Sequence, residues 1–141
     1  MNQAQKVETL DPAFAKNQYI MWQVAQCYNR LIEFDSTLQP IPSLASSWTI
    51  SADRKTYLFH LRNDVYFHDN PAFPGGKGRR MLASDVVYSF QRLLDAKTAS
   101  PGAWVFSDKV DRLQPFVAAN DSTFILHLQK PFTPMLGILG T

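Results

Sequence analysis

The stretch from Tyr57 to Leu94 constrains the fold most, because the spacing of its apolar residues changes part-way along. Residues 57–62 alternate with period 2, which is typical of a β-strand. Residues 84–94 repeat with helical period, and their apolar positions are Val86, Val87, Phe90, Leu93 and Leu94. Residues 70–80 lie between the two patterns and hold two prolines and three glycines, which exclude regular structure. The stretch therefore predicts a strand, a surface loop and an amphipathic helix, in that order.

A second helix is predicted to begin at Asn17 or Gln18. Its apolar positions recur at helical spacing, and they are Ile20, Val24, Cys27 or Tyr28, and Leu31. The positions between them are polar, so one helix face is predicted to pack in the core and the other to face water. Cys27 is expected to be half-buried on this helix. Because it is the single cysteine, it excludes an internal disulfide and a thiolate metal cluster.

The helix in residues 84–94 is predicted to have Ser84 as its N-cap. Asp85 then falls in the first turn, where a carboxylate complements the helix dipole. Two shorter helices are expected in residues 104–113 and 133–139. The first of these is only weakly specified by the sequence.

The remaining apolar segments predict an antiparallel sheet. Short strands are expected at residues 31–34 and 48–50. The polar turn at residues 51–55 returns the chain into the strand of residues 56–62, which makes a hairpin, and residues 116–128 repeat that pattern. The predicted fold class is α+β, a small antiparallel sheet with helices packed on one side. The pattern leaves the strand order open.

Length and charge narrow the possible functions. A chain of 141 residues with 45% hydrophobic content is long enough for one domain, residues 1–141, and too short for two ordinary ones. The net charge of +2 is too small to produce the strong positive field of a nucleic-acid binder. No apolar run approaches the roughly 18 residues of a membrane span. Because the net charge is so small, we expect no nucleic-acid partner.

Several short motifs in the sequence are similar to those of a known protein family. The central ones are Leu61-Arg62, Val65-x-Phe67-His68-Asp69 and Ala83-x-Asp85-Val-Val-Tyr-Ser-Phe-x-Arg92. The flanking ones are Leu10-Asp11-Pro12, Pro42-x-Leu44-Ala45-x-Ser47-Trp48, Asp121-x-Thr123-Phe124 and Leu128-x-x-Pro131-Phe132. Together these motifs cover roughly Leu10 to Leu139. They resemble the family 5 extracytoplasmic solute-binding proteins of ABC importers.

The resemblance implies a function and a place for the chain in a larger protein. Members bind oligopeptides and dipeptides, and some bind nickel, haem or sugars. By this resemblance the chain is the smaller subdomain of a type II periplasmic-binding-protein lobe. It would form one wall of a peptide cleft in a protein that delivers its ligand to an ABC importer permease. We expect a monomer without cofactor, periplasmic or membrane-anchored outside the cytoplasm, and a piece of a longer exported protein, since residues 1–6 lack the apolar core of a signal peptide.

The resemblance also implies which residues face the ligand. In peptide-binding members the segment after Leu-Asp-Pro contributes to the cleft, and this segment corresponds here to Lys16, Asn17 and Gln18. The turn after the central helix, Ser100-Pro101-Gly102-Ala103-Trp104, contributes as well, and Gly102 and Trp104 are its candidate ligand-binding residues. Oligopeptide binders tend to have an aromatic residue where this chain has Gly102, so Trp104 could supply the apolar wall instead, or it could pack inside the core. Backbone groups in such segments can pair with peptide main chain without reading side chains.

Two alternatives come from other classes of protein. A metal-dependent enzyme would need His60, His68 and His127 to converge, although a structural role suits histidines in strands and turns better. No Gly-x-Ser-x-Gly and no paired Cys and His with an orienting acid is present, so we expect no enzymatic activity. A freestanding interaction module would use the basic loop of residues 73–80. Residues 70–80 are predicted to be an inserted surface loop, since the resembled family usually has a short turn there.

Overall fold

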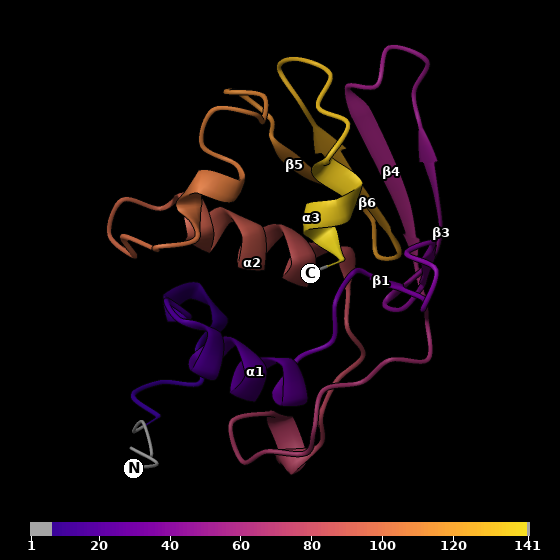
Figure 1. Ribbon diagram of the computed structural model, residues 1–141. Helices are drawn as coiled ribbons and strands as arrows, with labels where there is room; N and C mark the ends of the chain where they lie inside the picture. The colour runs from indigo at the N-terminus through magenta and orange to yellow at the C-terminus, as the bar shows by residue number, and fades with distance from the viewer. Residues whose placement is uncertain (1–6, 141) are drawn as a thin grey trace.

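The computed structural model describes residues 7–140, and Figure 1 shows the order and arrangement of its elements. The α-helices are α1 (Gln18–Cys27), α2 (Ala83–Leu94) and α3 (Met135–Leu139). Short 3-10 turns are η1 (Pro12–Phe14), η2 (Pro74–Gly76) and η3 (Ala103–Val105). The strands are β1 (Ile32–Phe34), β2 (Pro40–Pro42), β3 (Ala45–Ile50), β4 (Thr56–Leu61), β5 (Phe116–Asn120) and β6 (Thr123–His127). Within residues 7–140, no helix combines the length and the hydropathy that crossing a membrane requires.

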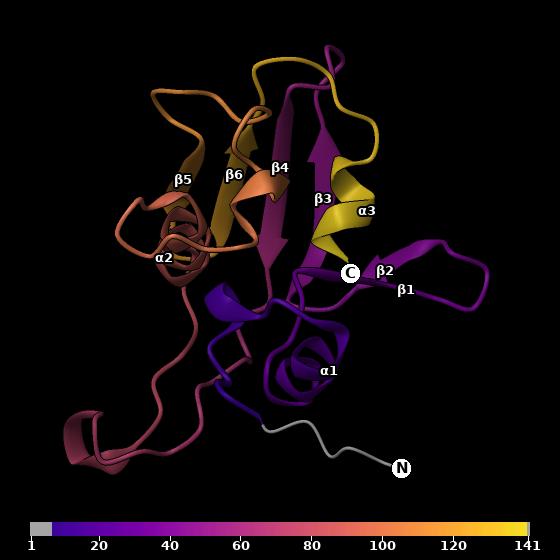
Figure 2. The ribbon, with the colours of Figure 1, turned by 60° about the vertical axis from the view of Figure 1, so that its left-hand side comes forward.

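The larger sheet has four antiparallel strands in the order β3-β4-β6-β5. Each outer pair is a hairpin of consecutive strands, and the pairing of β4 with β6 joins the two hairpins. Helices α2 and α3 lie on the same side of this sheet, and α1 lies beyond its end (Figure 2). Strands β1 and β2 form a separate two-stranded sheet. The predicted α+β class, a small antiparallel sheet with helices on one side, is confirmed.

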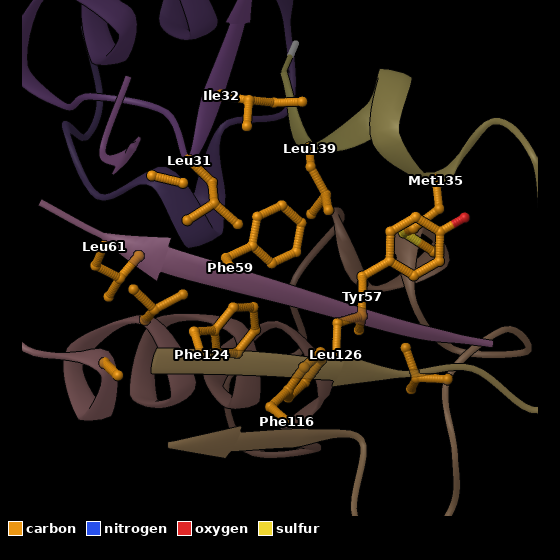
Figure 3. Packing of buried hydrophobic residues seen from close by; sticks show 14 of the residues in the cluster. Leu31, Ile32, Tyr57, Phe59, Leu61, Phe116, Phe124, Leu126, Met135 and Leu139 are labelled. Carbon is orange, nitrogen blue, oxygen red and sulfur yellow. The ribbon is translucent and has the colours of Figure 1, made fainter. Parts of the chain in front are cut away.

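Strand β4 carries the alternation that the sequence predicts. Tyr57, Phe59 and Leu61 are 2%, 0% and 5% exposed, whereas His60 on the opposite face is exposed. Phe59 pairs with Phe124 on β6, and their ring centroids lie 6.0 Å apart. Figure 3 shows these two side chains together in the core. The apolar face of β4 therefore lies at the centre of the hydrophobic core.

Helix α2 covers this face of the sheet mainly with Phe90. The centroid of the Phe90 ring lies 5.0 Å from that of Phe106 and 5.5 Å from those of Phe116 and Phe124. The contacts with Phe116 and Phe124 are edge-to-face, which adds to the free energy gained by burying the rings. The aromatic cluster thus joins α2 to the second hairpin and to the segment that follows η3.

The prediction that Ser84 caps α2 is wrong. The N-cap is Leu82, in an extended conformation, and the helix begins at Ala83. The N–H of Ala83 donates to the carbonyl of Asp121 at 2.8 Å, so a tertiary contact determines where the helix begins. Asp85 accepts a hydrogen bond from the N–H of Leu82 at 2.8 Å and does lie in the first turn, as predicted.

Two other local expectations differ from the structure. Residues 104–113 contain only the end of η3, and the N–H of Asp111 then donates to the carbonyl of His127 at 2.8 Å. Backbone pairing with the end of β6 therefore competes with a longer helix there. Cys27 is exposed and not half-buried, because α1 buries only Ile20 and Val24.

Candidate functional site

Two segments far apart in the sequence meet at the predicted ligand site. We call residues 10–18 the N-terminal arm and residues 99–104 the Ser100 turn. The arm is tied to α2 by Arg92, whose guanidinium donates to both carboxylate oxygens of Asp11 at 3.1 and 2.7 Å. Both side chains are 31% exposed, so water screens this bidentate pair only partly. The carboxylate of Asp11 also accepts from the N–H of Ala13 at 3.0 Å, which fixes the bend at η1.

Ser100 joins the turn to the arm. Its hydroxyl donates to the carbonyl oxygen of Ala13 at 2.5 Å, across 87 positions of sequence. The hydroxyl oxygen of Ser100 in turn accepts from the N–H of Gly102 at 3.1 Å. Ser100 is 7% exposed, so these hydrogen bonds are sheltered from water. The Ser100 turn is therefore held against the N-terminal arm at Ala13, upstream of the residues 16–18 that the resemblance singled out.

The three arm residues differ in what their side chains do. The side chain of Asn17 caps α1 by accepting from the N–H of Ile20 at 2.9 Å, so the predicted helix start is confirmed. Lys16 is exposed and pairs with Glu8 at 3.0 Å. Gln18, the first residue of α1, is exposed. Lys16 and Gln18 are thus accessible, whereas the side chain of Asn17 is already engaged in the cap.

In the Ser100 turn, Trp104 lies at the surface with 65% of its area exposed. Of the two alternatives for this residue, packing inside the core is wrong, because most of its surface is exposed. Lys109 donates to the carbonyl of Trp104 at 2.6 Å, and its ammonium lies 5.9 Å from the centroid of the indole ring. Gly102 is half-buried. Among the described residues, no hydrogen bond or ion pair links Gly102 or Trp104 directly to residues 16–18.

Sequence reasoning missed the residues that hold this junction together. Asp11 and Arg92 both belong to motifs of the resembled family, but neither motif indicates that the two side chains form a pair. Ser100 belongs to the turn that the resemblance indicated, but nothing in the sequence shows that its hydroxyl bonds the N-terminal arm. Its burial is the feature that distinguishes it, and burial depends on the folded structure.

A separate groove lies between the C-terminal end of α1, residues 65–73 and α2. Its volume is about 570 Å³, within the range of small-molecule sites. Its apolar walls include Leu31, Leu44, Val65, Met81, Val86 and Phe90. None of residues 16–18 or 100–104 lines it, so this groove is distinct from the predicted ligand site.

Comparison with known proteins identifies the family. The model of the bacterial extracellular solute-binding proteins, family 5 Middle, matches residues 39–141. The chain belongs to this family. A dipeptide-binding protein of Escherichia coli (strain K12) is 37% identical over 121 residues, which are 80% of this chain and 22% of that protein. Heme-binding protein A of Haemophilus influenzae is also 37% identical, over 82% of this chain and 22% of its own length.

The fold of this family 5 chain matches that of solved relatives. A periplasmic binding protein associated with an ABC transporter of Helicobacter pylori, solved in complex with a peptide, superposes with a TM-score of 0.77. It is 33% identical, and the match covers 93% of this chain and 27% of that one. The chain therefore spans about a quarter of the length of the relatives that it matches.

The basic loop of this family 5 chain does not form a free cationic patch. Each basic side chain in it has an acidic partner, and the pairs are Lys77–Asp69 at 2.7 Å, Arg79–Asp85 at 2.5 Å and Arg80–Asp121 at 3.6 Å. The hydrogen bond from Lys77 lowers the pKa of Asp69, as expected for such a pair. The arginine of the second pair also lies over the ring of Phe67, 5.0 Å from its centroid. The interaction-module alternative thus lacks the free charge that would attract an acidic partner.

The histidines have ordinary surroundings. His60 and His68 are exposed, and Nδ1 of His127 lies 3.3 Å from the hydroxyl of Thr56. Within residues 7–140, no three His, Cys, Asp or Glu side chains converge as a metal site requires. The metal-enzyme alternative therefore has no ligand set in the described part of the chain.

The Asp11–Arg92 pair predicts a pH dependence of stability. The hydrogen bonds from Arg92 hold the pKa of Asp11 below its ordinary value, against the opposing effect of burial. A depressed pKa means that the pair stabilises the fold above the unfolded-state pKa of about 4, and that this stability is lost as pH falls through the folded pKa. Asp11→Asn should therefore lower the free energy of unfolding by about 1–2 kcal/mol at pH 7 and by progressively less below pH ~4.

Urea unfolding of both proteins across this pH range measures the effect. Asp108→Asn removes the same charge from an exposed position and serves as the control. A difference between wild type and Asp11→Asn that stays constant from neutral to acid pH would contradict the prediction.

Proposed function

We propose that this chain is part of an extracytoplasmic solute-binding protein that captures peptides for an ABC importer, and that it forms one wall of the ligand cleft. The observation that carries the proposal is the family match over residues 39–141. The dipeptide-binding relative of E. coli and the peptide complex of the H. pylori relative favour peptide as the ligand. The junction of the N-terminal arm with the Ser100 turn supports the position of the site.

The ligand-facing residues in this proposal are Lys16, Asn17, Gln18, Gly102 and Trp104. The side chain of Asn17 accepts a hydrogen bond from the N–H of Ile20. The N–H groups of Gln18 and Tyr19, in the first turn of α1, have no partner within the helix. Such backbone groups can pair with a peptide main chain whatever its side chains are. The exposed indole of Trp104 would add an apolar surface for a ligand side chain.

The rest of the mechanism belongs to a longer protein in this proposal. Residues 1–141 would be one domain of it, with residues 70–80 as an inserted surface loop. A second lobe would close over the peptide by a hinge motion, stabilised by contacts made only in the closed state. The protein would work outside the cytoplasmic membrane as a monomer, deliver peptide to the importer permease, and perform no catalysis.

Calorimetry with di- to pentapeptides tests the proposal on two proteins, the 141-residue chain and the complete protein encoded by its gene. We expect the chain alone to bind no tighter than about millimolar, because one wall provides few contacts, and the complete protein to bind at micromolar or tighter. Micromolar binding by the chain alone would refute the division of the site between lobes. A complete protein that binds none of these peptides would refute the function.

A pair of matched variants tests the site itself. Trp104→Ala in the complete protein should weaken peptide binding about threefold to tenfold, through loss of an aromatic contact. Trp22→Ala removes an indole of similar exposure, 62% against 65%, from α1 outside both segments, and should leave affinity unchanged. Equal effects of the two variants would count against the proposed site.

Haem is the second candidate ligand, because heme-binding protein A of H. influenzae is as similar to this chain as the dipeptide-binding relative. Nickel and sugars are the other ligands that family membership leaves open. Titration of the complete protein with haem, followed by absorbance, separates haem from peptide directly. Haem binding together with no peptide binding would reverse the order of the two candidates.

A further inference from the structure

We propose that Ser100 is a positioning residue that fixes the Ser100 turn against the N-terminal arm and thereby sets the peptide affinity of the site. This inference rests on the function proposed above. Ser100 is not proposed to touch the ligand, since it is buried. It acts through Gly102 and Trp104, which are proposed to do so.

The hydroxyl of Ser100 both donates and accepts a hydrogen bond at this junction. Within the described part of the chain, Ser100 and Thr123 are the buried polar side chains. A serine hydroxyl offers one donor and an acceptor oxygen. Here the donor goes to the carbonyl of Ala13 at 2.5 Å, and the oxygen accepts from Gly102 at 3.1 Å. Removing the hydroxyl leaves both backbone groups without this partner, which is costly in a buried place.

The Ser100 turn also needs a stabilising contact from outside the turn. Ala99 has φ of +47°, in the left-handed region that costs an L-residue roughly 1–2 kcal/mol. The following residues form η3 through hydrogen bonds from Ala103 to Ser100 and from Val105 to Gly102, both 3.1 Å long. A turn that begins with an unfavourable conformation relaxes once the contact that compensates for it is lost. Ser100 supplies such a contact.

The placement of Trp104 depends on that turn. Its ring is 65% exposed, so core packing does not hold it in position. The arm on the other side of the junction is fixed independently by the Arg92–Asp11 pair, at 3.1 and 2.7 Å. The arm is therefore the fixed part of the junction, and Ser100 holds the turn against it.

Three variants of the complete protein test the role of Ser100. Ser100→Ala should weaken peptide binding about tenfold, and Ser100→Thr, which keeps the hydroxyl, should bind within about threefold of wild type. Ser89→Ala is the control, because it also removes a hydroxyl that donates to a backbone carbonyl, that of Asp85 at 2.8 Å, but at an exposed site outside the junction. Calorimetry gives the affinities, measured well below each melting temperature. A lower melting temperature of Ser100→Ala with unchanged affinity would overturn the proposal.

Amide hydrogen exchange in the 141-residue chain separates this inference from the proposed function. The amides of Val105 and Phe106, which close η3, should exchange at least about tenfold faster in Ser100→Ala than in wild type or Ser89→Ala. Wild-type exchange rates at these amides would refute the positioning role, whatever the ligand. A complete wild-type protein that binds no peptide would instead refute the proposed function, and the exchange rates alone would then decide whether Ser100 positions the turn.

Discussion

Phe124→Ala is expected to lower the free energy of unfolding by about 3–5 kcal/mol, a large part of the ~5–15 kcal/mol that stabilises a typical domain. Phe124 is 0% exposed. Its ring centroid lies 6.0 Å from that of Phe59, 5.5 Å from that of Phe90 and 6.4 Å from that of Phe116. The ring therefore contacts β4, α2 and β5 at once, and its removal leaves a cavity where the two hairpins and the helix meet.

Urea unfolding followed by circular dichroism measures this loss. Leu113→Ala is the control, because Leu113 is 91% exposed and its truncation should change stability by less than about 0.5 kcal/mol. A loss below about 1 kcal/mol for Phe124→Ala would mean that β6 does not join the two hairpins through a shared core.

Gly78→Ala is expected to lower the free energy of unfolding by about 2–3 kcal/mol, because a Cβ at this position would overlap the carbonyl group of Phe67. The obstacle is backbone, which cannot move aside as a flexible side chain can. The N–H of Phe67 donates to the carbonyl of Arg79 at 3.0 Å, and Tyr66 pairs with Arg80, so the two sides of the loop are held close together. The added methyl group must break this pairing.

Gly137→Ala provides a matched control for this substitution. Among residues 7–140, no atom outside the backbone of α3 and the neighbouring residues lies within 4 Å of a Cβ built at Gly137, in the middle of α3. Alanine there should raise the free energy of unfolding by up to about 1 kcal/mol, since glycine is the poorer helix former. Chemical denaturation of both variants gives the comparison, and a Gly78→Ala protein as stable as wild type would show that the loop opens without cost.

Most of the secondary structure could be predicted from the sequence, because hydrophobic period reports which face of a segment is buried. The alternation in residues 57–62 predicted β4, and the helical period after Ser84 predicted α2. The polar turns between strands predicted both hairpins of the larger sheet. These are local properties, so each segment indicated its own conformation.

Two of the errors arose where a backbone group distant in the sequence formed a hydrogen bond. Helix α2 begins before Ser84 because Ala83 bonds to Asp121, and no long helix follows η3 because Asp111 pairs with His127. In both cases a long-range hydrogen bond outweighed the local preference. A sequence window that ends a few residues away cannot contain that information.

The candidate site also combines features that the sequence indicates with features that only the folded structure shows. The sequence by itself determined most of the elements, the family resemblance and the two segments in which ligand contacts are proposed. The tertiary structure alone decided the strand order β3-β4-β6-β5, the exposure of Trp104 and the junction of Ser100 with Ala13. The physical reason is that a side-chain hydrogen bond across 87 positions forms only after the sheet and α2 have brought its two ends together.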